Sequence, residues 1–248
     1  MHSRILLISD LHLEESRPDI TNAFLQFLQS NTGNCTSLYI LGDFFEVWIG
    51  DDHHTDLSKS VSAALRDFSS AGSSIYIMHG NRDFLIGEEF AKQCNASLLD
   101  ERFVLRTDDF SALIIHGDQL CIDDLEYIEF RNMVRSAPWR ESFLAKPLAE
   151  RSAFAELARL QSKKATAGKS DEIMDVNQAE VEKLLKASGE MVLIHGHTHR
   201  PAIHQVEMES DNSQPKARRV VLGDWDKSVW IVEICGDQLN LLNQPLNP

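Results

Sequence analysis

Short apolar runs recur along the chain, and several of them stop directly at polar residues. The runs with the length of buried strands are Arg4–Ser9, Ser37–Leu41, Ser74–Met78 and Met191–Ile194. The segments between them repeat apolar residues at helical spacing, and we expect helices at Asp19–Ser30, Asp56–Ser69 and Gly87–Cys94. Strands that alternate with helices in this way predict an α/β core.

The second half of the chain has a different pattern, in which strands follow one another. Arg102–Arg106 and Ser111–Ile115 flank an Asp108-Asp109 turn and predict a hairpin. The tail from Ala202 to Leu242 is strand-like again. This second group of strands predicts that the core holds at least two sheets.

A helical region interrupts these strands. Gln119 to about Ser188 has almost no β-branched runs, and we expect one of its helices at Asp171–Ala187 and a flexible turn at Gly168. The region lies between two strands that end in polar residues. We therefore expect residues 1–248 to form a single domain, with a helical cap inserted at about Asp123–Ser170.

The charge of the chain is acidic overall but basic in one stretch. The formal net charge is −14, from 24 basic and 38 acidic residues. Such a chain is a poor nucleic-acid binder, because binding to that backbone requires clustered lysine and arginine. Phe130–Ser170 departs from this balance, with nine basic and three acidic residues. A basic stretch in an acidic chain predicts a site for an anion or for an anionic surface.

The cysteines and the apolar runs indicate where the protein is kept. The cysteines are far apart and include no C-x-x-C pair, which is typical of free thiols in a reducing compartment: they are Cys35, Cys94, Cys121 and Cys235. The first apolar run is too short for a signal peptide, and no run approaches the ~18 residues that a membrane helix needs. We expect a cytoplasmic protein that can still touch a membrane from that side.

Residues of the types that bind metals follow the expected strands. In chain order they are Asp10 with His12, Asp43, Asn81, His116, and His197 with His199. The carboxyl ends of strands are where sites assemble in α/β proteins. Carboxylate, imidazole and amide ligands suit Mn²⁺, Fe or Zn²⁺ and argue against a thiolate site. A purely structural role would require these polar groups to be buried together without partners, which is costly.

The spacing of these residues predicts two metal ions. Asp10 and His12 lie two apart after a strand, so both can point to one side, and His197 and His199 repeat that spacing. Asp43 falls between the two pairs and is the natural bridge. Two metals about 3.5–4 Å apart can activate a water molecule and clamp both oxygens of an in-line displacement. The pattern therefore predicts hydrolysis of a phosphate ester or anhydride.

The order D-x-H, G-D, G-N, H and G-H-x-H resembles that of the calcineurin-like metallophosphoesterases, from Asp10 to His199. The resemblance implies a four-layer α-β-β-α sandwich. It implies two ligand sets, which are Asp10, His12, Asp43 and His199 for one metal and Asp43, Asn81, His116 and His197 for the other. Among these residues we expect Asp43, Asn81 and His116 to be catalytic.

Arg82 departs from many members of that superfamily, which place a proton donor after the G-N motif. Arginine does not give up its proton at working pH, but it can clamp a phosphate with two hydrogen bonds. A site without a general acid suits a leaving group that needs no proton, such as a phosphate monoester, whose second pKa is about 6. Arg82 therefore favours a pyrophosphate bond over an alkyl ester, and we expect it to be a catalytic residue.

Longer motifs narrow the resemblance over nearly the whole chain. They lie at Gly42–Asp52 (G-D-F-F-E-V-W-I-G-D-D), His79–Phe84 (H-G-N-R-D-F), Ile173–Asn177 (I-M-D-V-N) and His195–Pro201 (H-G-H-T-H-R-P). These motifs resemble the UDP-2,3-diacylglucosamine hydrolase family of lipid A biosynthesis. The resemblance implies attack of metal-activated water on the phosphorus next to uridine, which gives UMP and 2,3-diacylglucosamine 1-phosphate (lipid X). It also implies two Mn²⁺ per chain and peripheral association with the cytoplasmic face of the cell inner membrane.

The same resemblance implies a set of contacts to the lipid-linked UDP-sugar substrate. They are Asn81, Arg82, Asp124, Tyr127, Ser162, Thr166, Lys169 and His197, and Thr166 replaces an asparagine of the family. The lysines of the basic stretch suit the pyrophosphate, and its apolar residues suit either acyl chains or ordinary helix packing. Basic residues beside an apolar surface also suit docking on an anionic membrane. His195 precedes the last ligand pair and either contacts the phosphate or supports the ligands.

Two alternatives remain open on the sequence. One is a calcineurin-like nucleotide or UDP-sugar pyrophosphatase without lipid specificity. The other is a scaffold that keeps the fold and has lost catalysis. The complete set of expected metal ligands argues against the scaffold.

Overall fold

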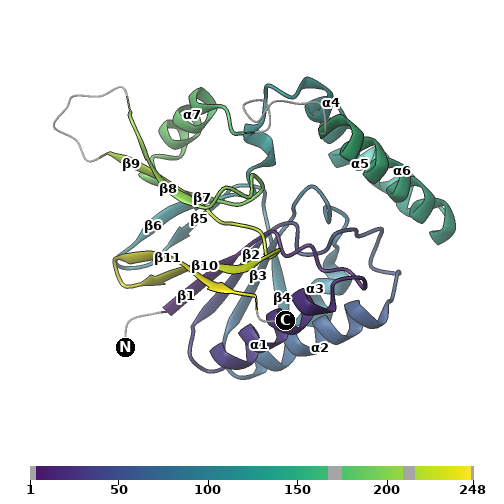
Figure 1. The fold of residues 1–248 in the computed structure, drawn as a ribbon, viewed down its shortest axis with the longest axis horizontal. Coiled ribbons are helices and arrows are strands. Elements are labelled where there is room, and N and C mark those ends of the chain that lie inside the picture. Colours follow the sequence, from purple (N-terminus) through teal and green to yellow (C-terminus); the bar gives the residue numbers. More distant parts are fainter. Residues whose placement is uncertain (1–3, 167–174, 209–215, 247–248) are drawn as a thin grey trace.

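Two β-sheets form the centre of the computed structural model, which describes residues 4–166, 175–208 and 216–246, without the side chains of 163–166 (Figure 1). The first sheet has the order β11-β10-β1-β2-β3-β4 and the second β5-β6-β7-β9-β8. The strands of the first are β1 (Arg4–Ile8), β2 (Ser37–Leu41), β3 (Ser74–Met78), β4 (Ala96–Leu99), β10 (Ser228–Cys235) and β11 (Gln238–Pro245). Those of the second are β5 (Phe103–Arg106), β6 (Ser111–Ile114), β7 (Val192–His195), β8 (Ala202–Val206) and β9 (Ala217–Val221).

Helices cover the outer face of each sheet. They are α1 (Pro18–Asn31), α2 (Asp56–Ser70) and α3 (Glu88–Cys94) on the first sheet and α7 (Gln178–Ser188) on the second (Figure 1). Side chains alternate between the two faces of each strand, so Leu6 and Ile8 of β1 pack against the helices while Leu7 packs toward the second sheet. The result is the four-layer α-β-β-α sandwich, and this prediction is confirmed.

The core between the sheets fixes the two halves of the molecule against each other. Tyr39 and Leu41 of the first sheet share a buried cluster with Ile114 and Ile194 of the second. The strands of the parallel pairs β1–β2, β2–β3 and β6–β7 are each followed by residues that we expect to bind metal. Their carboxyl ends therefore bring the expected metal ligands of both sheets to one edge of the core.

The segment that follows β2 is a loop held by its own side chains. Asp51 accepts hydrogen bonds from the backbone N–H groups of Gly87 (2.9 Å) and Phe90 (2.9 Å), and so closes the first turn of α3. The indole N–H of Trp48 donates to the same carboxylate at 3.0 Å. These bonds give the G-D-F-F-E-V-W-I-G-D-D motif a structural role in addition to its expected metal ligand.

One expected boundary was wrong, and one strand was not expected. The helix expected at Asp171–Ala187 begins at Gln178, because Asn177 caps it by accepting a hydrogen bond from the backbone N–H of Glu180 (3.2 Å). Residues 171–174 and the turn expected at Gly168 lie outside the described residues. The short strand β4 (Ala96–Leu99) was not expected, and it follows directly on Asn95, which ends α3 in the left-handed region.

A helical insertion, α4 (Leu125–Arg135), α5 (Ala137–Leu144) and α6 (Leu148–Thr166), lies between β6 and α7 and stands to one side of the sheets (Figure 1). It is fastened to the loop after β2 by Arg151, whose buried guanidinium donates to the carbonyl of Ile49 (2.6 Å) and pairs with Asp52. In the part of the chain that is described, no helix is both long enough and apolar enough to cross a membrane.

Candidate metal centre and adjoining pocket

Two groups of side chains offer metal ligands at the carboxyl ends of the strands. Asp10, His12 and His199 form one group, and Asp43, His116 and His197 form the other. Within each group the ligand atoms lie within 4.8 Å of one another. The structure therefore brings together six of the seven residues that the sequence singled out as metal ligands.

Asp43 lies between the two groups. Its Oδ2 is 3.8 Å from Nε2 of His12, and its Oδ1 is 3.6 Å from Nε2 of His116. The backbone N–H of Arg82 also donates to Oδ1 at 2.8 Å, which holds the carboxylate in this orientation. Each oxygen of Asp43 thus faces a different group, as a bridging ligand requires.

Asn81 joins the second group. Its Oδ1 is 3.0 Å from Nε2 of His116, whose Nδ1 lies 2.8 Å from the carbonyl oxygen of Leu41. The Leu41 carbonyl fixes the imidazole with Nε2 turned to the group. All seven expected ligands therefore converge.

The backbone is in a rare conformation at these residues. Among the described residues, six non-glycine residues have a positive φ, and five of them are Asp10 (55°), His12 (49°), Asp43 (49°), His197 (66°) and His199 (53°). Non-glycine residues seldom adopt this region, and such strain clusters at functional sites. The surrounding structure holds these residues in place at a cost in stability.

Two glycines explain why the motifs read G-N and G-H. A Cβ atom on Gly80 would lie 2.1 Å from the backbone nitrogen and Oδ1 of Asp43. A Cβ atom on Gly196 would lie 2.1 Å from Oδ2 of Asp10 and from Oγ of Ser9. Any side chain at these positions would displace an expected metal ligand.

Carboxylates orient both imidazoles of the first group. Nδ1 of His12 is 2.8 Å from Oε2 of Glu46, and Nδ1 of His199 is 3.5 Å from Oδ2 of Asp224. The Nε2 atoms of the two rings then face each other at 3.3 Å. A histidine ligand with its other ring nitrogen on a carboxylate is the usual arrangement at metal sites.

Burial keeps two histidines neutral. It lowers the pKa of His197 to about 4, with His116 adding to the effect, and the pKa of His195 to about 3, with Arg219 adding to the effect. Both ring nitrogens of the buried His195 are near partners, Nδ1 at 2.8 Å from the carbonyl oxygen of Gly196 and Nε2 at 3.4 Å from Nη1 of Arg219. This arrangement favours support of the Gly196–His199 loop over contact with a phosphate.

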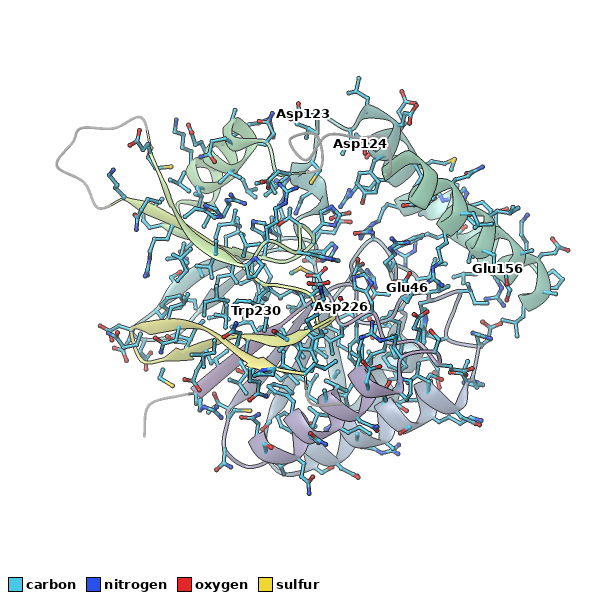
Figure 2. All side chains as sticks on the ribbon, viewed as in Figure 1. Glu46, Asp123, Asp124, Glu156, Asp226 and Trp230 are labelled. Atoms are coloured by element: carbon cyan, nitrogen blue, oxygen red, sulfur yellow. The ribbon has the colours of Figure 1, made fainter. Side chains whose placement is uncertain are left out.

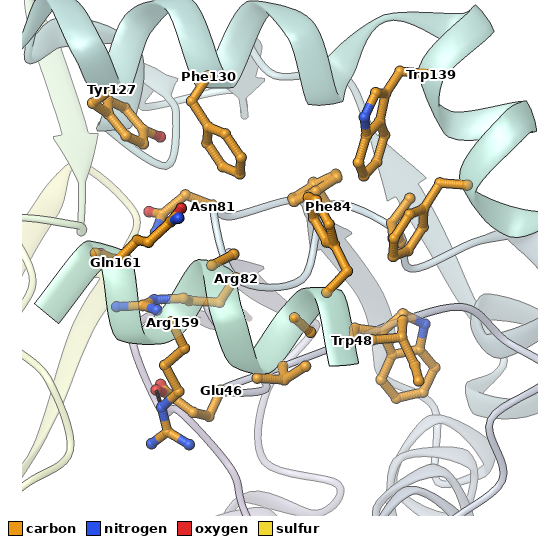
Figure 3. A pocket seen from close by; sticks show the side chains of 18 of the residues that line it. Glu46, Trp48, Asn81, Arg82, Phe84, Tyr127, Phe130, Trp139, Arg159 and Gln161 are labelled. Atoms are coloured by element: carbon orange, nitrogen blue, oxygen red, sulfur yellow. Dashed lines mark ion pairs between the residues drawn. The ribbon is translucent and has the colours of Figure 1, made fainter. Parts of the chain in front are cut away.

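A cavity of about 300 Å³ opens beside the second group, between the insertion and the loops after β2 and β3 (Figure 3). Asn81, Arg82 and Tyr127 line one part of it. The remainder is mainly apolar and is lined by residues that include Ile49, Phe84, Leu85, Trp139, Phe143 and Phe154. Figure 3 shows Trp139 on the far side of the cavity from Asn81, with Phe84 between them. The cavity can take a molecule with a polar head and an apolar body.

Five of the expected substrate contacts line this cavity. Asp124, Tyr127 and Ser162 line it together with Asn81 and Arg82. Figure 2 shows Asp124 at the beginning of α4 and Glu156 on α6, both in the insertion. His197 stacks on Tyr127, with ring centroids 6.2 Å apart. The side chain of Thr166 and all of Lys169 lie outside the described residues.

Comparisons with known proteins agree with this geometry. The calcineurin-like phosphoesterase model matches residues 3–201. The UDP-2,3-diacylglucosamine hydrolase of Marinobacter nauticus is 51% identical over 242 residues, which cover 97% of this chain and 98% of that protein. The chain belongs to the UDP-2,3-diacylglucosamine hydrolase family of calcineurin-like phosphoesterases. Proteins of that name from Chromohalobacter salexigens and Ectopseudomonas mendocina are 49% and 46% identical, covering 89% and 98% of this chain and 88% and 99% of their own length.

In this member of the UDP-2,3-diacylglucosamine hydrolase family, several residues of the site were not expected from the sequence. Glu46 and Asp224 turn the imidazoles, and Arg159 places its guanidinium beside Glu46, with Nε 2.9 Å from Oε1 (Figure 3). Glu46 stands inside the G-D-F-F-E motif, which was a signal for it. Asp224 and Arg159 stand in no such motif, and one charged residue in a sequence does not indicate which residue it will contact.

Proposed function

We propose that this protein hydrolyses the pyrophosphate bond of UDP-2,3-diacylglucosamine to UMP and 2,3-diacylglucosamine 1-phosphate, a step of lipid A biosynthesis. The observation that carries the proposal is a cavity that adjoins the second group of expected metal ligands at Asn81 and is polar at Arg82 and apolar at Trp139. A diacylated sugar phosphate is likewise polar at its phosphate and apolar along its acyl chains. The names of the similar proteins support the same substrate.

The donor set fits two divalent cations. Calcineurin-like phosphoesterases are metal-dependent, and oxygen and imidazole ligands suit Mn²⁺, which we propose as the native metal. Asp10, His12, Asp43 and His199 would hold one ion, and Asp43, Asn81, His116 and His197 the other. Two bound ions supply a water-derived nucleophile at neutral pH and neutralise phosphate charge.

Arg82 binds the phosphate in this proposal. Its Nε is buried and has no hydrogen-bond partner among the described residues, although buried donors are nearly always paired. Arg82 also lines the cavity next to Asn81. An unpaired guanidinium donor at this position is available for a phosphate oxygen, which it can bind through two hydrogen bonds.

The helical insertion acts as the cap of the substrate site. Trp139 and Phe143 of α5 stack at 4.6 Å, and Phe154 of α6 packs on both. Acyl chains in this part of the cavity would be removed from water, and each buried methylene contributes about 0.8 kcal/mol. Recognition of the acyl chains would therefore supply a large share of the affinity.

Peripheral association with the cytoplasmic face of the inner membrane completes the proposal. The insertion exposes large apolar side chains to solvent, with 72% of Leu125, 61% of Leu157 and 57% of Leu160 accessible. A substrate with two acyl chains is held in a membrane. A protein that draws it into a cavity beside such side chains gains from lying on the lipid surface.

The test compares the wild-type protein on acylated and deacylated UDP-glucosamine with Mn²⁺. We expect kcat/KM to be at least about 100-fold higher for the diacylated substrate, because several buried methylenes add to its affinity. Equal values on both substrates would contradict the proposal and favour a UDP-sugar pyrophosphatase without lipid specificity. Sedimentation with anionic vesicles tests the membrane contact, and a protein that stays in the supernatant would contradict it.

A further inference from the structure

A buried carboxylate next to the centre has no part in the ligand sets. Asp118 begins a short 3-10 helix, Asp118–Leu120, two residues after His116, and 2% of it is exposed. Its Oδ2 accepts hydrogen bonds from the hydroxyl of Tyr127 (2.7 Å), Nε of Arg131 (2.8 Å) and Nη2 of Arg135 (3.5 Å). All three donors stand on α4, so one oxygen atom of the core holds most of one face of that helix.

The same donors reach the loops that carry expected metal ligands. The ring of Tyr127 stacks on that of His197 at an interplanar angle of 27°. Nη2 of Arg135 also donates to the carbonyl of Gly80 at 2.9 Å, directly before Asn81. Through Asp118, α4 is therefore joined to the loops of both Asn81 and His197.

Because Asp118 is buried, its contacts with α4 depend on its negative charge. A carboxylate bonded to two guanidinium groups is stable away from water only while the whole set is present. Glu101 also pairs with Arg131 (2.8 Å) and Arg135 (2.7 Å), but its side chain is 41% exposed and the pairs are open to solvent screening. Asp118 and Glu101 thus contact the same two arginines from a buried and an exposed side.

We propose that Asp118 is a positioning residue that holds Tyr127 and α4 against the metal centre, as the wall of the cavity nearest the phosphates. This inference rests on the proposed function for the identity of the substrate. The Tyr127 hydroxyl donates its proton to Asp118. Tyr127 can therefore contact a bound substrate only through its ring and through a lone pair of its oxygen. It follows that Tyr127 does not protonate the leaving group.

Asp118→Asn and Glu101→Gln are a matched pair for the test. Both remove one negative charge from the same arginines, and only Asp118→Asn disturbs the partner of Tyr127. We expect Asp118→Asn to lower kcat/KM for the diacylated substrate by about 10- to 100-fold, mainly through KM, because a small displacement of a substrate-binding group has an effect of this size. We expect Glu101→Gln to stay within about threefold of wild type, as an exposed pair contributes little. The metal content of both variants should equal that of wild type.

A second variant keeps the test decisive if Asp118→Asn does not fold. Tyr127→Phe keeps the ring and removes the hydroxyl, and Tyr127→Ala removes both. We expect Tyr127→Phe to retain much more activity than Tyr127→Ala, with an unchanged pH profile on the basic side, because the hydroxyl gives its proton to Asp118 and not to the substrate. Equal losses of activity in Tyr127→Phe and Tyr127→Ala, or loss of the basic limb of the pH profile in Tyr127→Phe, would overturn the inference.

Failure of this inference can be told apart from failure of the proposed function. If wild type hydrolyses the diacylated substrate and Asp118→Asn matches it, or if Glu101→Gln is equally impaired, the positioning role is wrong. If wild type does not hydrolyse that substrate, the proposed function is wrong, and amide hydrogen exchange still decides the positioning role. In that experiment α4 should exchange faster in Asp118→Asn than in Glu101→Gln, and equal exchange would overturn it.

Discussion

Nδ1 of His12 lies 2.8 Å from Oε2 of Glu46. This contact sets the ring so that Nε2 faces the group that His12 shares with Asp10 and His199. It also raises the pKa of His12 against the opposing effect of burial. Glu46 in turn is 2.9 Å from Nε of Arg159 on α6, so one carboxylate contacts both an expected metal ligand and the cap.

Glu46→Gln is therefore expected to weaken one of the two metal sites. Loss of a carboxylate that orients a histidine ligand lowers metal affinity by about 10- to 100-fold. Titration of the metal-free protein with Mn²⁺, followed by calorimetry, measures the two affinities. Glu14→Gln is the matched control, since Glu14 also contacts Arg159, at 3.3 Å. The role assigned to Glu46 fails if both variants bind two ions as tightly as wild type.

Arg82→Lys is expected to lose activity although it keeps the charge. Lysine offers a single ammonium group and cannot reproduce the two parallel bonds of a guanidinium to a phosphate. Loss of one charged hydrogen bond corresponds to a fall of about 10- to 100-fold in kcat/KM. Steady-state kinetics on the diacylated substrate measure it. An unchanged kcat/KM would assign Arg82 a structural role only.

A bulky residue in the cavity wall is expected to exclude the acyl chains. Ala155 of α6 lines the cavity, and Ala153 on the same helix is exposed. Ala155→Trp should raise KM for the diacylated substrate by at least about tenfold, because methylenes remain in water, whereas Ala153→Trp should not. Activity of both variants on a small phosphodiester serves as the control for the metal centre. The acyl assignment is wrong if Ala155→Trp binds the lipid substrate like wild type.

The cysteines give a prediction that does not involve the site. Cys35, Cys94 and Cys121 are buried, and burial raises the pKa of Cys94 and of Cys121 to about 12. A buried thiol with a raised pKa is inert, because the thiolate is the reactive form. A colorimetric thiol reagent should therefore modify the half-buried Cys235 in the native protein and the other cysteines only after unfolding. Rapid modification of all the thiols in the native state would contradict the packing described here.

The sequence predicted the regular elements well where it carries a helical period or an uninterrupted apolar run. The helix expected at Asp56–Ser69 is observed at Asp56–Ser70, and the strand at Ser37–Leu41 has the expected bounds. The start of α7 and the strand β4 were not predicted correctly. Asn177, with Glu180 three residues later, is the signal for the true start of α7, and it was overlooked. Ala96–Leu99 has no strand-like period of its own and pairs because β3 offers it an edge.

The residues expected to bind metal, which the fold brings together, could be selected from the sequence because their types and their order after strands are specific. The side chains that hold these residues in place could not be selected from the sequence. Asp118 and Asp224 find their partners only through the tertiary fold, and no spacing in the sequence relates Asp118 to Tyr127. The positive φ values at Asp10 and His199 are also a product of the fold, since only a few per cent of non-glycine residues adopt that region.

The most direct test of the whole account is hydrolysis of UDP-2,3-diacylglucosamine in ¹⁸O-labelled water, with and without Mn²⁺, followed by mass spectrometry of both products. We expect cleavage only with the metal, one ¹⁸O atom in UMP, and none in the diacylglucosamine 1-phosphate. That distribution follows if the nucleophile held between the two ligand groups attacks the phosphorus next to uridine while Arg82 binds the phosphates. Label in the sugar phosphate, or undiminished cleavage after the metal is removed, would contradict it.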